Sequence, residues 1–206
     1  MKLYYSPGAC SLGIHVLLEE IAKPYQTQSV NLREGEQYQP AFTSINPKSK
    51  VPTLVRDDGS VLTEFPAIAY WLARTNADKK LLPEDPEGQA RALEALDYVV
   101  ATLHMQGVTR IFRPENFSPN PADQEKVKAR GKEIFEKGLS LIDKQLAGKE
   151  YVTGSFSIAD AALFYVEFWG AGRLQIQLPP NCEAHYKRML TRPAVQKVMQ
   201  AEGLQG

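Results

Sequence analysis

Strand-like patterns are confined to the first third of this 206-residue chain, and this asymmetry limits the possible folds more than any other feature. The Asp58-Gly59 pair is a strong hairpin signal between the last two of these patterns. Helical spacing of apolar residues begins at Ser11, and Pro66 is suited to the first turn of another helix. The predicted strands cover residues 2–5, 25–32, 51–55 and 61–63.

Beyond about residue 78 the apolar spacing is helical throughout. Asn120-Pro121 is typical of an N-cap followed by proline in the first helical turn. Ser157 and Asp160 have the spacing of a capping box, which predicts a further helix start. We therefore expect an α+β chain with a mixed-sheet domain at residues 1–77 and an all-helical domain at residues 88–206.

Composition excludes several classes of protein. Lys and Arg total 24 and Asp and Glu total 24, so the chain lacks the basic excess with which proteins neutralise nucleic acid phosphates. Two cysteines are too few for a disulfide scaffold, and they fit a reducing compartment. No export signal or membrane span is evident, which predicts a soluble, cytoplasmic protein without nucleic acid or membrane partners.

Cys10 is the first candidate for chemistry, because it stands where the first strand has ended and a helix begins. The unpaired N–H groups and positive dipole end of a helix favour thiolate, so we expect a lowered pKa. A small buried residue near a turn is the alternative. Tyr5 and Ser11 are possible hydrogen-bond donors to the sulfur, although packing and N-capping are their commoner roles. Position 13 is glycine, so no second cysteine completes a dithiol motif.

A second group of candidates lies around the predicted hairpin. The backbone of Val51 is pushed to an extended conformation by Pro52, which suits pairing with an added peptide strand. If Phe65 occupies the helix N-cap, it offers no side-chain oxygen to the first-turn N–H groups, which are then left for a ligand carboxylate or water. Glu64 is suited to a ligand ammonium group, or is simply a surface acid at a helix start.

His104 lies on the apolar stripe of the first long helix of the second domain, where a histidine is more often a core group than a ligand. The three histidines and two cysteines show no metal-ligand spacing, which predicts no metal site.

Together these features resemble the cytosolic glutathione transferases, whose fold joins a thioredoxin-like domain to an all-helical one. Residues 5–11 (YSPGACS) and Leu103-His104 resemble the bacterial beta class. The likeness covers nearly the whole chain, and it extends to Asn46-Pro47-Lys48 before Val51-Pro52, Phe112-Arg113-Pro114 and the Ser157–Asp160 box.

The resemblance implies a site for glutathione as co-substrate. Val51, before a cis Pro52, pairs with the cysteinyl backbone, while Glu64 and the Phe65 N–H hold the γ-glutamyl end. Cys10 lies beside the glutathione sulfur, with Tyr5, Ser11 and His104 as further catalytic candidates. The implied glutathione contacts also include Arg33, Asp97 and Ala101. Arg33 is the cation nearest to a missing family lysine, Asp97 replaces an asparagine, and Met105 replaces a lysine.

The expected reaction is conjugation of the glutathione thiol to a small apolar electrophile, with detoxification as the expected role. A pocket between the domains is expected for the electrophile, lined by Phe112, Phe117, Tyr165 and Trp169. A glutathione-dependent disulfide reductase using Cys10 and a non-catalytic carrier of apolar ligands remain as alternatives. A homodimer is expected, although Gly131 and Gly138, which allow close helix approach, serve a fold core equally well.

Overall fold

The computed structural model describes residues 1–204 and divides into two compact units. The first contains Met1–Leu82 and the segment from Met189 onward, and the second contains Pro83–Arg188. The boundary near residue 82 falls inside the predicted seam at residues 78–88. The C-terminal segment differs from the expected division at 88–206, because it groups with the first unit rather than with the helical one.

The first unit is built on a four-stranded sheet in the order β2-β1-β3-β4. β1 pairs in parallel with β2 and antiparallel with β3, which pairs antiparallel with β4. All four predicted strands are confirmed, although β2 and β3 are shorter than expected. The strands are β1 (Lys2–Tyr5), β2 (Gln26–Ser29), β3 (Thr53–Val55) and β4 (Val61–Thr63).

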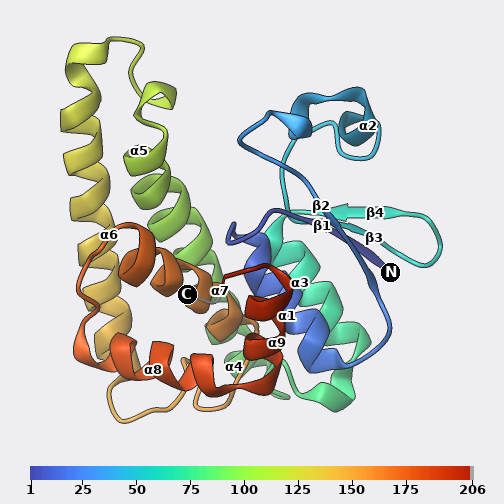
Figure 1. Ribbon diagram of the computed structural model, residues 1–206. Helices are drawn as coiled ribbons and strands as arrows, with labels where there is room; N and C mark the ends of the chain where they lie inside the picture. Colours follow the sequence, from blue (N-terminus) through green and yellow to red (C-terminus); the bar gives the residue numbers. More distant parts are fainter. Residues whose placement is uncertain (205–206) are drawn as a thin grey trace. The chain divides into compact units, whose positions relative to one another are not determined.

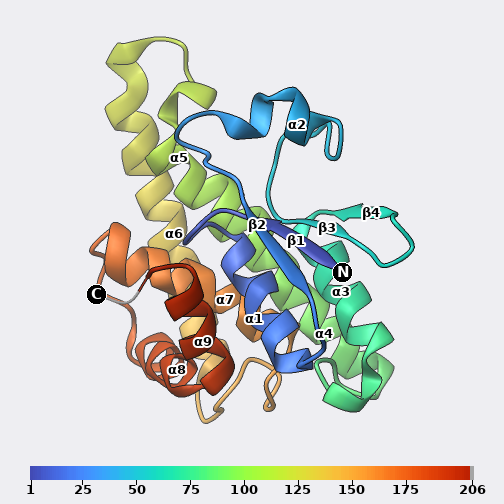
Figure 2. The same ribbon diagram turned by 45° about the vertical axis from the view of Figure 1, so that its right-hand side comes forward.

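Two helices of the first unit, α1 (Ser11–Ile21) and α3 (Phe65–Thr75), pack together on one face of this sheet (Figures 1 and 2). α9 (Pro193–Ala201) packs on α1, which explains why the C-terminal segment belongs to this unit. The segment with α2 (Pro40–Thr43) lies off the opposite face (Figure 2). Single 3₁₀ turns are η1 (Glu36–Tyr38) and η2 (Ala77–Lys79).

The second unit is helical throughout, as predicted. One long helical run consists of α4 (Pro86–Asp97), a π-helical segment η3 (Tyr98–Val108) and α5 (Thr109–Phe112). The other elements are η4 (Pro114–Asn116), η5 (Pro121–Asp123), α6 (Gln124–Leu146), α7 (Ile158–Phe168), the π-helical η6 (Trp169–Arg173) and α8 (Pro180–Thr191), which runs across the unit boundary. Over residues 1–204, no helix has the length and apolar character needed to cross a membrane.

Both cap predictions in this unit are confirmed. The Asn120 side chain accepts a hydrogen bond from the Ala122 N–H at the start of η5, and Ser157 and Asp160 form the capping box of α7.

Glycines on α6 bring this helix close to η3 and α5, which run beside it (Figure 1). A Cβ at Gly131 would lie 2.7 Å from the Gly107 carbonyl oxygen, and one at Gly138 would lie 2.6 Å from Leu103 Cδ1. Both contacts are tighter than packed atoms allow. The sequence left open whether these glycines serve a dimer interface or the fold core. These contacts assign them to packing inside the second unit.

Candidate active site

Cys10 is the N-cap residue of α1, as its position in the sequence predicts. Its Sγ donates a hydrogen bond to the Val51 carbonyl oxygen at 3.4 Å. The residue is partly exposed, but the sulfur itself is surrounded by protein, and this burial raises the pKa of the thiol to about 12. The expected lowered pKa is therefore wrong. Desolvation outweighs the opposing effects of the Ser11 backbone N–H and the Lys50 charge.

The two other predicted donors near Cys10 have different partners. The Ser11 hydroxyl donates to the Ser6 carbonyl at 3.3 Å and accepts from the Ser6 N–H at 3.1 Å. It thus fixes the turn before α1 and is not the N-cap. The Tyr5 ring packs 5.4 Å from the imidazole of His15, and burial raises the pKa of the phenol.

Val51 supplies the backbone position expected to receive a peptide strand. The Val51-Pro52 peptide bond is cis, as the family resemblance implied. The side chain is 8% exposed and packs in a small core with Val30 and Phe42, which fixes the loop. Among residues 1–204, no protein group accepts a hydrogen bond from the Val51 N–H. The site therefore offers a donor for an extended ligand beside the Cys10 sulfur.

Glu64, rather than Phe65, is the N-cap of α3, so the predicted cap position is wrong by one residue. Glu64 has a φ of 69°, a left-handed conformation that turns the chain sharply from β4 into the helix. Its exposed carboxylate accepts a hydrogen bond at 2.8 Å from Nζ of Lys48, which also bonds to the Thr63 hydroxyl at 2.9 Å. Phe65 is 4% exposed and serves the core through its side chain.

Sequence reasoning missed Glu202, because nothing in a C-terminal Glu-Gly pair marks it as part of a site. Its Oε2 accepts a hydrogen bond at 2.8 Å from the Gly8 N–H, two residues before Cys10. Its Oε1 lies 2.8 Å from Nδ1 of His15 on α1. Glu202 therefore ties the end of α9 to the loop that carries Cys10.

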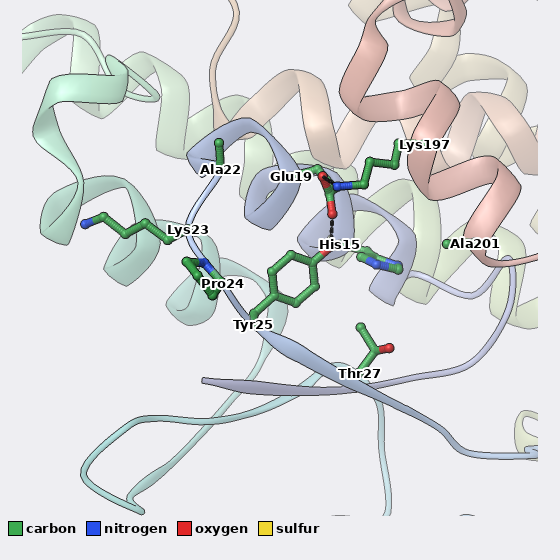
Figure 3. Close-up of a pocket in the computed structure, with 9 residues that line it drawn as sticks. All are labelled: His15, Glu19, Ala22, Lys23, Pro24, Tyr25, Thr27, Lys197 and Ala201. Carbon is green, nitrogen blue, oxygen red and sulfur yellow. Dashed lines mark hydrogen bonds and ion pairs between the residues drawn. The ribbon is translucent and has the colours of Figure 1, made fainter.

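A cavity of about 480 Å³, with His15 in its lining, lies between α1, α9 and the start of β2 (Figure 3). Three of its polar side chains are paired with one another: the Tyr25 hydroxyl donates to Glu19, and Lys197 lies 2.8 Å from the same carboxylate. None of the predicted site residues lines it.

In the second unit, His104 lies in an aromatic cluster with Tyr165 and Trp169. The Tyr165 hydroxyl is 3.3 Å from Nδ1 of His104, and the Trp169 ring centroid is 4.8 Å from that of the imidazole. Two of the four predicted electrophile-binding residues thus lie against the predicted histidine. Phe112 and Phe117 lie elsewhere on the unit, 44% and 38% exposed, with the Arg110 guanidinium 4.1 Å above the Phe117 ring.

The remaining predicted residues are exposed. Asp97 ends α4 and Ala101 lies on η3, both accessible to solvent. Arg33 is on the loop after β2, where its N–H bonds to Asn31. Within residues 1–204, no group of three or more His, Cys, Asp or Glu side chains has an arrangement that could hold a metal ion.

Comparisons with known proteins identify the family. The sequence model for the glutathione S-transferase N-terminal domain matches residues 8–75, which include Cys10, Val51 and Glu64. Glutathione S-transferase GstA of Escherichia coli O157:H7 is 37% identical over 212 residues, covering 99% of this chain and 100% of the relative.

The chain belongs to the glutathione S-transferase family.

Solved structures of other glutathione S-transferases agree with this assignment. The beta-class glutathione S-transferase of Sphingomonas chungbukensis is 33% identical, with a TM-score of 0.85 and 100% of both chains covered. A glutathione transferase homologue from Sulfitobacter with bound glutathione is 28% identical, with a TM-score of 0.92, covering 99% of this chain and 98% of that chain. The predicted resemblance to the beta class and the thioredoxin-like first domain are thereby confirmed.

Proposed function

We propose that this glutathione S-transferase binds glutathione on its first unit and transfers the glutathione thiol to small apolar electrophiles. The observation that carries the proposal is the 3.4 Å hydrogen bond from Cys10 Sγ to the Val51 carbonyl. An extended peptide paired with the Val51 backbone has its own side chain beside that sulfur. A cysteinyl residue bound there therefore presents its thiol to Cys10.

Binding uses complementary groups at the γ-glutamyl end of the ligand. The Glu64 carboxylate holds the ligand ammonium, which replaces Lys48 Nζ as the partner of this carboxylate. The Phe65 backbone N–H, at the first turn of α3, donates a hydrogen bond to the ligand carboxylate. Arg33 adds a peripheral contact on the same unit in this arrangement, and Asp97, Ala101 and His104 stay contacts that the family resemblance predicts.

Cys10 acts in this proposal as a hydrogen-bond donor and not as a nucleophile. Its raised pKa keeps the proton on the sulfur at neutral pH. The S–H group then turns from the Val51 carbonyl to the glutathione sulfur and stabilises its thiolate. The glutathione thiol loses its proton to solvent, and the thiolate attacks the electrophilic carbon while the leaving group departs with the bonding electron pair. A neutral Cys10 thiol is a poor agent for disulfide exchange, which argues against the reductase alternative.

The electrophile, the assembly and the location belong to the same proposal. Phe112 and Phe117, which are exposed, offer apolar surface to the second substrate, while Tyr165 and Trp169 are buried against His104. The enzyme acts as a cytoplasmic homodimer in the detoxification of such electrophiles. Light scattering at micromolar concentration tests the dimer, and a monomer mass would contradict it.

The binding site is tested by calorimetry on Glu64→Ala with glutathione as ligand. Loss of a hydrogen bond to a charged group is expected to weaken binding by about 1.5–3 kcal/mol. Asp78→Ala, an exposed acid on η2 of the same unit, is the matched control and should leave affinity unchanged. Equal affinity of wild type and Glu64→Ala would contradict the assignment. Turnover of a chlorodinitrobenzene-type acceptor, measured beside a glutathionyl disulfide, tests the reaction.

A further inference from the structure

We infer that the cavity between α1 and α9 is a second binding site, which takes a small neutral phenol whose hydroxyl donates a hydrogen bond to Nε2 of His15. All of its lining residues belong to the first unit, and none of them is part of the proposed glutathione site. The inference therefore goes beyond the transferase function and does not depend on it.

Two helices each turn one face toward this cavity (Figure 3). His15 and Glu19 are four residues apart on α1, and Lys197 and Ala201 are four apart on α9, so each pair lies on one side of its helix. The segment from the end of α1 to the start of β2 supplies the remaining side. The volume of about 480 Å³ lies within the range of about 300–1,000 Å³ that is usual for small-molecule sites.

Nε2 of His15 is the polar atom that the fold leaves for a ligand. Nδ1 lies 2.8 Å from the Glu202 carboxylate, and only 3% of the His15 side chain is exposed. Among residues 1–204, no protein group forms a hydrogen bond with Nε2. In this part of the chain, the side-chain atoms that are both fully enclosed and unpaired belong to other residues. Nε2 therefore touches accessible space, and His15 lines the cavity.

The bond to Glu202 decides what the ligand must supply at this nitrogen. A carboxylate accepts hydrogen bonds, so the proton of the neutral imidazole is on Nδ1, and Nε2 presents its lone pair. The matching ligand group is a hydrogen-bond donor such as a hydroxyl.

The charged groups of the lining favour a ligand without charge. Burial raises the pKa of Glu19, but the hydrogen bonds from Lys197 and Tyr25 outweigh it and lower the pKa, so Glu19 is a carboxylate paired with Lys197 at 2.8 Å. Nζ of Lys23 donates to Asn76 at 2.6 Å and extends away from the other lining residues (Figure 3). A charged ligand would have to break one of these pairs or lose water without gaining a partner.

The rest of the lining suits an aromatic ring. The Tyr25 ring stands at 89° to the imidazole of His15, with centroids 5.8 Å apart, and Ala22, Pro24 and Ala201 add apolar surface. A ligand ring gains edge-to-face and van der Waals contacts here while its hydroxyl bonds to Nε2. A phenol combines the ring and the donor in one small neutral molecule.

Calorimetry on the wild-type protein at neutral pH tests the ligand class with three probes. We expect p-ethylphenol to bind. The ether p-ethylanisole has a similar ring but no hydroxyl proton, and it should bind about 3- to 10-fold more weakly, the worth of one hydrogen bond. The anion p-ethylbenzoate should bind more weakly than the phenol as well. No binding of the phenol, or binding of the ether or the anion that is as tight, would overturn the inference.

A substitution on α9 tests the location of the site. Ala201→Leu should weaken binding of p-ethylphenol by about 10-fold or more, because the larger side chain occupies part of the cavity. Gln200→Leu, at the neighbouring exposed position that does not line the cavity, is the matched control and should leave the affinity unchanged. Equal affinities of the two variants would place the phenol elsewhere and contradict the inference.

Nitrogen-15 NMR of histidine-labelled protein reports on Nε2 itself. The chain has three histidines, and His104→Gln and His185→Gln each remove one of the other two signals. We expect the Nδ1–H tautomer for His15, and its Nε2 signal should shift further with p-ethylphenol than with p-ethylanisole. A proton on Nε2 in the free protein, or a His15 signal that bound phenol leaves unchanged, would overturn the inference.

Discussion

Nδ1 of His15 lies 2.8 Å from Oε1 of Glu202, although 187 residues separate the two in the sequence. The side chains are 3% and 0% exposed, so the pair is closed off from water. The second oxygen of Glu202 accepts from the Gly8 N–H. One carboxylate near the end of the chain thus holds both α1 and the loop before Cys10.

Removing this carboxylate should destabilise the first unit. Glu202→Leu leaves His15 and the Gly8 N–H buried with one partner fewer, and we expect a loss of about 3 kcal/mol in the free energy of unfolding. Urea denaturation measures it. Glu87→Leu, which removes an exposed carboxylate paired with Arg91, is the control and should cost less than about 1 kcal/mol. Equal effects of the two substitutions would show that burial does not increase the contribution of the His15–Glu202 pair to the free energy of unfolding.

The raised pKa of Cys10 predicts that its thiol is alkylated slowly. In a Cys182→Ala background, iodoacetamide should alkylate Cys10 of the folded protein at least about 10-fold more slowly than the unfolded chain at pH 7.5, since thiolate is the reactive form. The rate should still be rising at pH 10. A folded-state rate equal to that of the unfolded chain would contradict the assignment of Cys10 as a neutral donor.

Conjugation should depend on Cys10 as a donor only. Cys10→Ala is expected to lower kcat/KM for conjugation by about 3- to 10-fold, because one hydrogen bond to the sulfur is lost. Cys10→Ser retains a donor and should recover most of the rate. Complete loss of activity in both variants would instead make the thiol itself indispensable.

Gly138 should tolerate no side chain. A Cβ there would lie 2.6 Å and 2.8 Å from Cδ1 and Cγ of Leu103, whose side chain is fully buried. We expect Gly138→Ala to destabilise the second unit by about 1–3 kcal/mol through overpacking. Gly172→Ala is the matched control, because nothing lies within 4 Å of its Cβ position. Thermal unfolding of the two variants gives the comparison.

A buried charged cluster in the second unit predicts a pH dependence. His185 lies between two carboxylates, 2.8 Å from Glu167 and 3.2 Å from Asp160, and all three side chains are 0% exposed. Burial lowers the pKa of His185, but the charge of Glu167 and the hydrogen bonds to both carboxylates outweigh it and raise the pKa to about 10. The histidine is therefore charged at neutral pH in the folded protein.

Because the folded pKa is the higher one, this contribution to stability is complete below pH 6.5 and disappears as the pH rises through about 10. Between these values a one-proton difference gives a slope of about 1.4 kcal/mol per pH unit at most. Urea denaturation from pH 8 to 10 measures the slope for wild type and for His185→Gln, above the pKa of Glu167, which burial raises to about 7. We expect a smaller slope in the variant, and identical slopes would show that His185 does not take up a proton on folding.

The order of elements could be predicted from the sequence because each signal is local. The Asp58-Gly59 turn, the Asn120 cap and the Ser157–Asp160 box act through neighbouring residues, and all three were confirmed. Cys10 at the start of α1 was likewise predicted from the break between strand and helix.

The state of Cys10 could not be predicted in the same way. The neighbouring residues predict that Cys10 lies at a helix N-terminus and that its thiol has a lowered pKa. The pKa of this thiol depends mainly on how much protein surrounds the sulfur. The surrounding atoms come from segments far along the chain, such as Val51. Ser11 was misjudged for a related reason, because its hydroxyl bonds to Ser6.

The sequence by itself determined the two-part α+β architecture, the family and the positions of Cys10, Val51 and Glu64, since turns, caps and apolar periods are properties of short segments. Only the tertiary structure decided that the C-terminal helix belongs to the first unit and that Glu202 reaches Gly8 and His15. It also decided that Tyr165 meets His104. Such contacts join residues tens to hundreds of positions apart, and burial and hydrogen-bond partners follow from packing in three dimensions.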